Sequence, residues 1–253
     1  VKLMGAPPQA RKTDPRAYAL FLQARQAGRL GTAAGLAQAV TLYRASLAID
    51  PAYAPAWVGL SSSYANQANG GQRPIDAGFR LARQAVDKAL AIDPDSARAH
   101  AQLGFLAMNH DGNLAVAAGH LQRALALAPD DFGSILNAAR LAQTLGRLEQ
   151  AIALDQYVAT HDPLNARAHY NLGVDHFYDG RMADAIASWR STLALSPGFI
   201  GAWYNIGTAQ MISGRADAAL ESMRNEPEEG WRAIGLPMVY FALGKKAESD
   251  AAL

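Results

Sequence analysis

Prolines recur along this chain at a nearly constant interval, and this feature restricts the fold more than any other. Successive intervals of 43, 35, 34 and 34 residues separate Pro51, Pro94, Pro129, Pro163 and Pro197. Glycines keep the same interval of 34 residues at Gly112, Gly146, Gly180 and Gly214. Self-similarity at a period of this length indicates a stack of small units and not one globular core. We therefore expect the functional surface to be extended.

Each unit is predicted to be a pair of helices. An alanine stands five residues after each of these glycines, at Ala117, Ala151, Ala185 and Ala219. A glycine turns the chain at the end of the first helix at little cost because it has no Cβ. The alanine allows the second helix to pack closely against the first. The proline then ends the second helix, since it has no N–H to donate and moves its predecessor out of the α region.

In the first helices, a large residue is followed by an aliphatic residue and a glycine, as at His169, Leu172 and Gly173. The chain here resembles the tetratricopeptide repeat family, in which a large residue, a Leu-Gly pair, an aromatic, an alanine, a large residue and a proline spread over about 34 residues. Residues 165 to 197 match this pattern nearly throughout, with Leu172, Gly173, Gly180, Ala185, Trp189 and Pro197 in place. The resemblance implies an all-α fold, namely a right-handed superhelical solenoid of helix-turn-helix repeats.

About seven repeats are expected after a linker over residues 1–13, and the last is incomplete. Their expected ranges are 14–52, 53–95, 96–130, 131–164, 165–198, 199–228 and, for the partial repeat, 229–253. The first repeat has about five extra residues around Gly28 and Gly31, and the second has about nine, including Gly70 and Gly71. A solenoid needs a polar cap over its last helix, and Ala251, Ala252 and Leu253 supply none. We therefore expect a fragment of a longer protein.

Composition excludes several classes of function. The formal net charge of +1 gives no long-range field that would favour nucleic acid. The chain has no cysteine, so disulfides, thiolate metal sites and a cysteine nucleophile are excluded. It has no apolar run of about 18 residues, so we expect no membrane insertion. No HExxH pattern, phosphate-binding loop or serine elbow occurs. We expect no enzyme and no cofactor. Both the cytoplasm and the periplasm stay open, with the cytoplasm slightly favoured.

Helical geometry places the candidate binding residues on one wall. Successive side chains of a helix rotate by about 100°, so the positions opposite the family pattern cluster together. The resemblance implies that they line the inner, concave wall of the superhelix. The residues that we expect to bind a partner there are Gln102, Asn137, Arg140, Tyr170, Asn171, Val174, Tyr178, Tyr204, Asn205 and Thr208.

Four amides occupy the same position in consecutive repeats, at Gln102, Asn137, Asn171 and Asn205. A primary amide has a donor and an acceptor, as a peptide backbone has, so such a row can hold an extended segment. Alternatively, the amides bond to the neighbouring repeat or to water. Tyr170 and Tyr204 would add contact area at small entropic cost, and the alternative for them is packing between repeats.

Basic residues also fall on this wall. Arg98, Arg140 and Arg167 can attract an acidic ligand, although isolated arginines on a solvated wall usually confer only solubility. Family members that clamp the terminal carboxylate of chaperones carry a lysine at the fifth position of a repeat, where this chain has Ala101, Leu136, Tyr170 and Tyr204. We therefore expect no such clamp.

The first hypothesis for function is a protein-interaction module that binds an extended peptide in the groove of repeats three to six. The alternatives are self-association through the solenoid ends and a ligand-sensing domain of a larger protein. The segments DPRAYALFLQAR and LYRASLAIDPAYAPAWVGLSSSYA are similar to tetratricopeptide regions of bacterial signalling proteins, including class III adenylate cyclases and winged-helix regulators. This second resemblance implies a sensory or scaffolding segment of a bacterial protein.

Overall fold

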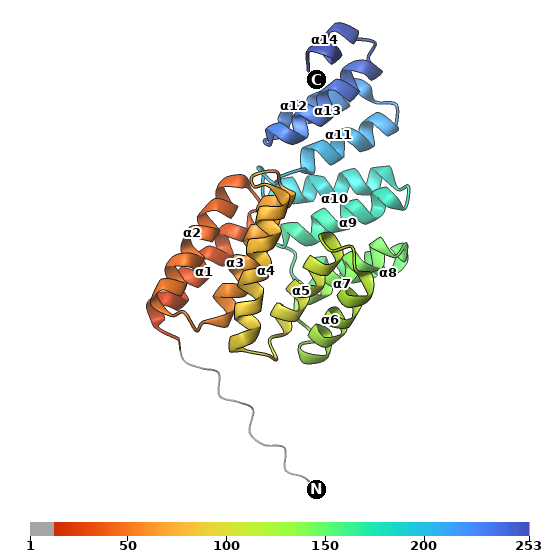
Figure 1. Cartoon of the computed structure of the whole chain (residues 1–253). Coiled ribbons are helices and arrows are strands. Elements are labelled where there is room, and N and C mark those ends of the chain that lie inside the picture. Colours follow the sequence, from red (N-terminus) through yellow and green to blue (C-terminus); the bar gives the residue numbers. More distant parts are fainter. Residues whose placement is uncertain (1–12, 253) are drawn as a thin grey trace.

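The computed structural model describes residues 13–252, in which all regular secondary structure is helical (Figure 1). The linker expected over residues 1–13 lies, apart from Thr13, outside the described residues. In chain order the helices are α1 (Pro15–Arg29), α2 (Ala33–Ile49), α3 (Ala54–Asn69), α4 (Ile75–Ile92), α5 (Ala97–Asn109), α6 (Leu114–Leu127), α7 (Phe132–Thr144), α8 (Leu148–His161), α9 (Ala166–Tyr178), α10 (Met182–Leu195), α11 (Ala202–Ile212), α12 (Ala216–Asn225), α13 (Glu229–Ala242) and α14 (Lys246–Ala251).

Consecutive helices pack as seven hairpins, from the pair α1 and α2 to the pair α13 and α14. The first helices of neighbouring hairpins also contact one another, from α1 to α9, and they form an inner row. In the first five hairpins, the second helix of each pair lies on the outer side of this row (Figure 1). Helices α11 to α14 continue the stack away from the first repeats (Figure 1). The predicted all-α repeat solenoid is confirmed.

Glycine and proline end the helices as the sequence predicts. Gly112, Gly146, Gly180 and Gly214 adopt φ values of 65°, 74°, 78° and 74°, in the left-handed region that favours glycine. Each of the five periodic prolines stands two residues beyond the last residue of a second helix. The period of the sequence is therefore the period of the hairpin turns.

Close packing within a hairpin depends on a glycine of the first helix. A Cβ on Gly173 would lie 2.5 Å from Nε1 of Trp189, which is 1% exposed on the second helix. The Trp189 indole instead donates a hydrogen bond to the backbone oxygen of Tyr170 at 3.1 Å. A larger residue at Gly173 would separate α9 from α10. The four periodic alanines are fully buried at the same interfaces.

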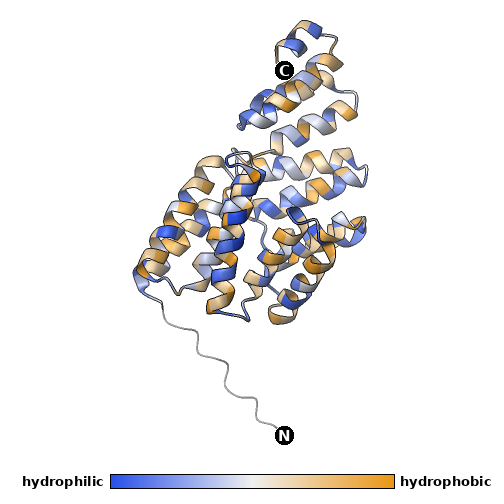
Figure 2. Ribbon diagram, viewed as in Figure 1, coloured by the Kyte–Doolittle hydropathy of each residue, from blue (hydrophilic) through white to orange (hydrophobic). Residues whose placement is uncertain are grey.

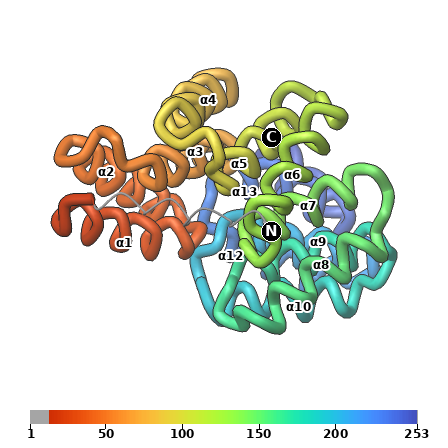
Figure 3. Tube along the Cα trace, turned by 90° about the horizontal axis from the view of Figure 1, so that it is seen from below, coloured from red at the N-terminus to blue at the C-terminus, as the bar shows by residue number. Residues whose placement is uncertain are grey.

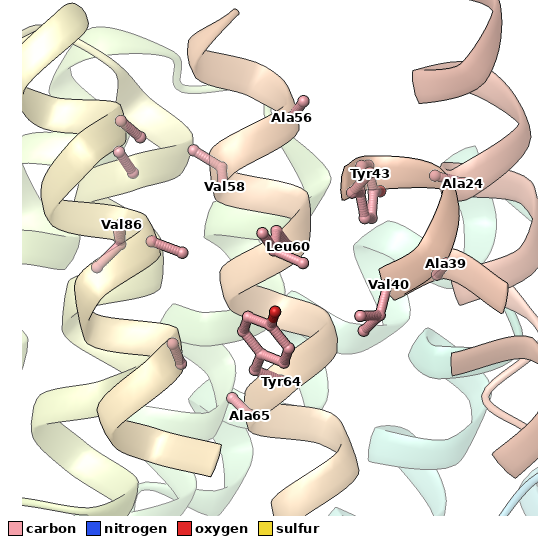
Figure 4. Close-up of a cluster of buried hydrophobic side chains, with 14 of the residues drawn as sticks. Ala24, Ala39, Val40, Tyr43, Ala56, Val58, Leu60, Tyr64, Ala65 and Val86 are labelled. Carbon is pink, nitrogen blue, oxygen red and sulfur yellow. The ribbon is translucent and has the colours of Figure 1, made fainter. Parts of the chain in front are cut away.

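The largest buried apolar cluster joins the first two hairpins to α5. Figure 4 shows Val40 and Tyr43 of α2 facing Leu60 and Tyr64 of α3, with Val86 of α4 on the far side of α3. Four similar clusters follow along the stack. The core is thus a series of interfaces between helices, as expected for a solenoid.

Apolar and polar residues are mixed along the helices of the stack (Figure 2). Within residues 13–252, no helix combines the length and the apolar character that crossing a membrane requires.

Candidate functional site

The inner row of helices curves until the first hairpin meets the turn between α10 and α11. The backbone N–H of Ile200 donates to the carbonyl oxygen of Gly31 at 3.2 Å. The hydroxyl of Ser196 donates to the carbonyl oxygen of Leu30. Nearby, the guanidinium of Arg29 pairs with the Asp162 carboxylate at 3.0 Å. We use the term closing contact for the contacts between the turn at residues 30–32 and the turn at residues 196–201. Figures 1 and 3 show the two turns side by side.

Phe199 fills the centre of the closing contact. Its ring is 3% exposed and stacks on Tyr170 with 4.9 Å between the ring centroids. A Cβ on Gly31 would lie 2.6 Å from Cε2 of this ring, and Gly31 has a φ of 64°. Only glycine therefore combines the required turn with this approach of the ring. On the other side, the guanidinium carbon of Arg167 lies 5.4 Å from the Phe199 ring centroid.

The closing contact makes the concave face a partly enclosed space of about 470 Å³, which we call the central cavity. Its walls come from the inner helices α1, α3, α5, α7 and α9, with Tyr43 of α2 and Phe199 completing them. The sequence predicted a groove along this face. The structure joins the first repeat across it to the boundary between the fifth and sixth repeats.

Five arginines and three aspartates line the central cavity. They are Arg25, Arg29, Arg98, Arg140, Arg167, Asp130, Asp131 and Asp162. Two ion pairs form among them, between Arg98 and Asp131 at 2.7 Å and between Arg29 and Asp162 at 3.0 Å. The lining therefore carries more positive than negative charge.

Two of these charged groups have shifted pKa values. Burial alone would raise the pKa of Asp131, but Arg98 and the hydrogen bonds from Ser134 outweigh it, and the pKa is lowered. Asp131 thus remains a carboxylate that caps α7 and pairs with Arg98. Burial lowers the pKa of Arg167 to about 10, and the neighbouring charge of Arg140 acts in the same direction. The guanidinium of Arg167 stays charged at neutral pH, in a site that disfavours its charge.

Four of the ten sequence-predicted site residues line the central cavity, namely Gln102, Asn137, Arg140 and Asn171. The Asn137 amide donates to the backbone oxygen of Ala101 in the preceding repeat at 3.2 Å. Gln102 is 6% exposed, and its Nε2 has no hydrogen-bond partner within residues 13–252. Asn171 is also 6% exposed, and its Oδ1 has no hydrogen-bond partner within the same range.

The other six candidate residues lie elsewhere. The Asn205 amide donates to the Tyr170 hydroxyl at 3.0 Å, so this pair joins two repeats. Tyr204 packs on Trp231 with 4.8 Å between ring centroids, and the Thr208 hydroxyl donates to the Tyr204 backbone oxygen at 3.0 Å. The two remaining residues are Val174, which packs against the core of α9 to α11, and Tyr178, which is 64% exposed. In the sixth repeat, Asn205 and Tyr204 thus make contacts between repeats, whereas Thr208 bonds within its own helix.

Residues that the sequence did not single out complete the lining. Arg25 and Arg29 come from α1, and Phe199 comes from the turn before α11. The available signal was the irregular spacing near Gly31 and Gly70, which lie in the turns that approach residues 196–201. The curvature of the stack cannot be derived from that spacing, so the sequence did not indicate which turns would meet.

A buried carboxyl pair adjoins the central cavity behind Arg140. Asp155 of α8 and Asp175 of α9 are each 1% exposed. The Gln143 amide donates to Asp175 at 2.7 Å. Burial, together with the neighbouring Asp175, raises the pKa of Asp155 to about 9. Burial also raises the pKa of Asp175, to about 6. The pair therefore retains one proton at neutral pH.

Metal binding has no geometric support in residues 13–252, where no group of three or more His, Cys, Asp or Glu side chains is arranged to hold an ion.

The repeat pattern and hairpin geometry agree with comparison to known families. A model of the tetratricopeptide repeat matches residues 77–132, 136–198 and 172–231. The chain belongs to the tetratricopeptide repeat family. The closing contact and the central cavity are therefore features of a tetratricopeptide solenoid.

A similar tetratricopeptide protein is the Hsp70-Hsp90 organizing protein of Triticum aestivum, which is 30% identical over 158 residues. The match covers 62% of this chain and 26% of that protein, so the chain spans about a quarter of its relative. Nothing in the comparisons bears on the resemblance to regions of adenylate cyclases and winged-helix regulators.

Solved structures share the fold at low sequence identity. Pseudomonas aeruginosa PilF has a TM-score of 0.56 at 19% identity and covers 80% of this chain and 89% of its own. The type IV pilus biogenesis factor PilW has a TM-score of 0.53 at 17% identity, covering 94% and 99%. A monomeric mutant of IFIT1 has a TM-score of 0.69 at 14% identity, covering 92% and 57%. These likenesses extend to the fold alone.

Proposed function

We propose that this chain is a non-catalytic scaffold module that holds an extended segment of a protein partner in the central cavity. Membership of the tetratricopeptide family supports a role in protein–protein interaction. A relative of this chain is named as an organizing protein for Hsp70 and Hsp90. By analogy, this chain would bring a partner to a larger assembly.

The observation that carries the proposal is the unpaired, buried amide of Gln102 in the wall of the central cavity. Leaving a buried donor without an acceptor costs free energy. A backbone carbonyl of a bound segment would supply the acceptor. Phe105 and Leu136 on the same wall offer apolar contact beside it. Asn137 and Asn205 are already bonded to neighbouring repeats, so we assign them a smaller part in binding than Gln102.

Peptide selection tests the proposal. Random peptides would be displayed and selected on the immobilised chain, and the affinity of each selected peptide would be measured by calorimetry. We expect Gln102→Ala to weaken binding by about three- to tenfold, the effect of one hydrogen bond. Gln150→Ala, an exposed change on α8, is the matched control and should leave the affinity unchanged. Failure to select any peptide, or equal affinity for the Gln102→Ala and unmodified chains, would contradict the proposal.

A specific observation favours self-association as a second function. Ile234, Met238 and Phe241 of α13 are 53%, 44% and 74% exposed. Their spacing places them on one face of the helix. We propose that this face contacts a second copy, and Phe241→Glu should then shift the molar mass measured by light scattering from dimer to monomer. A mass that stays monomeric for the unmodified chain at all concentrations would exclude this function.

A further inference from the structure

The central cavity has positive charge that its own acids do not balance. Asp131 and Asp162 are engaged by Arg98 and Arg29 in the two ion pairs. Within residues 13–252, the three other arginines of the lining, Arg25, Arg140 and Arg167, form no ion pair with a carboxylate. The remaining acid of the lining, Asp130, forms no ion pair in that part of the chain. The excess is therefore concentrated on three side chains of α1, α7 and α9.

The acids around these arginines supply only part of the missing charge. Burial keeps Asp155 protonated at neutral pH, because its pKa is raised to about 9. The pKa of Asp175 is raised only to about 6, so this buried carboxylate contributes one negative charge near Arg140 without forming an ion pair with it. The charge of Glu226 raises the pKa of Tyr170, which lies near Arg167 and Arg140. The two carboxylate oxygens of Glu226 are occupied, because they accept hydrogen bonds from the backbone N–H groups of residues 201, 204 and 228. Tyr170 itself stays neutral because burial raises its pKa. Within residues 13–252, Arg140 and Arg167 thus lie near each other with no carboxylate in an ion pair with either, and the charge of Arg140 lowers the pKa of Arg167.

The aromatic contacts position two of the arginines but do not neutralise them. Arg167 lies against Phe199, and the guanidinium carbon of Arg25 lies 5.6 Å from the Phe21 ring centroid. Contact with a ring face holds a guanidinium plane while leaving its N–H groups available. The unpaired Nε2 of Gln102 adds one more donor, on a side chain that is 6% exposed. The cavity thus presents several donors and few free acceptors.

We infer that the central cavity binds a compact anion with at least two negative charges, of phosphoryl or carboxylate chemistry, through Arg140 and Arg167 with Arg25 and Gln102 in support. Guanidinium groups bind such oxygens through two parallel hydrogen bonds. The volume of about 470 Å³ lies in the range of small-molecule sites. The anion is either a free small molecule or a pair of acidic side chains on a bound segment.

This inference uses the same cavity as the proposed function, but it does not require a protein partner. Binding of a small anion by the chain alone tests it separately from peptide selection. If selected peptides bind while no anion does, the proposed function stands and the anion site is refuted. If anions bind while no peptide is selected, the anion site stands and the proposed function is refuted.

The experiment is calorimetric titration of the chain with inorganic pyrophosphate, citrate and a hexaglutamate peptide, with hexaglutamine as the uncharged control. We expect pyrophosphate or citrate to bind if the anion is a free small molecule, and hexaglutamate alone to bind if it belongs to a segment. Hexaglutamine should bind in neither case. Absence of binding by all three anionic probes would overturn the inference.

Matched arginine variants locate the site. Arg140→Gln with Arg167→Gln should lower the affinity of the binding probe by at least about tenfold, since two charge-assisted contacts are lost. Arg190→Gln, on the exposed side of α10, is the control and should change the affinity less than twofold. Equal losses in the two proteins would show non-specific attraction and overturn the inference.

A measurement on the unmodified chain covers the case in which the double variant does not fold. A ligand that binds the folded state raises the melting temperature. At least one of pyrophosphate, citrate and hexaglutamate should therefore raise the melting temperature more than sodium chloride of equal ionic strength. Shifts equal to that of sodium chloride for all three probes would overturn the inference.

Discussion

The backbone N–H of Ile200 donates a hydrogen bond to the carbonyl oxygen of Gly31 at 3.2 Å, which joins the turn before α11 to the turn after α1. A tetratricopeptide stack without such a bond would have a concave face open along its length. In this chain the bond, together with the Phe199 ring, fixes the distance between the first repeat and the start of the sixth repeat. The shape of the central cavity therefore depends on residues that lie far apart in the sequence.

Gly31→Ala should destabilise the chain more than Gly112→Ala. Both glycines have positive φ, at 64° and 65°, so both changes carry the same backbone strain of about 1–2 kcal/mol. A Cβ at Gly31 would also meet the Phe199 ring, whereas a Cβ at Gly112 meets no described atom within 4 Å. We expect an additional loss of about 1–3 kcal/mol at Gly31 from the steric overlap. Urea denaturation of the two variants measures the difference in the free energy of unfolding. Equal losses of this free energy would show that the Phe199 ring moves aside without cost.

Glu226→Ala should destabilise the C-terminal repeats. The Glu226 carboxylate is 1% exposed and accepts the backbone N–H groups of Gly201 at 3.1 Å and Tyr204 at 3.2 Å, at the start of α11. Alanine would leave these donors without their acceptors, at a cost of about 1–3 kcal/mol for each buried group. Limited proteolysis should show faster cleavage between α10 and α12. Glu226→Gln retains one oxygen and should lie between alanine and the unmodified chain; a variant with alanine that resists proteolysis equally well would contradict this role.

The helices and their pairing could be predicted because they depend on neighbours in the sequence. A glycine such as Gly180 turns the chain locally, and a proline such as Pro163 ends a helix locally, so the period of 34 residues gave the hairpins. The closing contact could not be predicted in this way. It depends on a small rotation at each repeat, which accumulates over five repeats before Phe199 reaches Gly31.

The extra residues of the first two repeats were the sequence feature that corresponds to the closing contact. Gly31 belongs to the first insertion, and Gly70 of the second insertion lies so near Ile200 that a Cβ would be 3.3 Å from its Cδ1. Gln72 further contacts Glu228 at 3.5 Å. The insertions therefore lengthen the turns that meet the later repeats. The positions of the insertions could be identified from the sequence. The sequence did not show that both would approach the turn at residues 196–201.

The amide row was predicted in part for a similar reason. Sequence position placed Gln102 and Asn171 on the cavity wall. It did not show that Asn205 would find the Tyr170 hydroxyl, because that partner occupies a different position in the preceding repeat. Periodicity gives the direction of a side chain but not the identity of the group that it meets.

Stability should fall as the pH rises from about 5 to 9, because Asp155 has a folded-state pKa raised to about 9. A carboxyl group with a raised folded pKa leaves stability intact below its unfolded pKa of about 4, and stability is lost as the pH rises toward the folded value. Asp155→Asn removes the ionisation and should increase stability at pH 9 by at least about 1 kcal/mol while flattening the slope. Urea denaturation across this pH range gives the slope.

The control for this pH dependence is Asp217→Asn, an exposed change on α12 that should retain the slope of the unmodified chain. A slope that Asp155→Asn leaves unchanged would show that the buried pair does not control the pH dependence. An Asp155→Asn variant that is less stable at every pH would show that its amide cannot replace the protonated carboxyl group.

Phe199→Ala should open the central cavity as well as destabilise the chain. The ring is 3% exposed and contacts Tyr170, Arg167 and the backbone near Gly31, so its removal leaves a void at the closing contact. Loss of a buried phenylalanine costs about 3–5 kcal/mol. With the ring gone, the turns at residues 30–32 and 196–201 lose their main apolar contact, and small-angle scattering should record a larger radius of gyration. Val116→Ala removes an apolar side chain that is 45% exposed on α6 and should change neither quantity. A Phe199→Ala protein that is destabilised but keeps its radius of gyration would show that the hydrogen bonds alone, from Ile200 and Ser196, hold the solenoid closed.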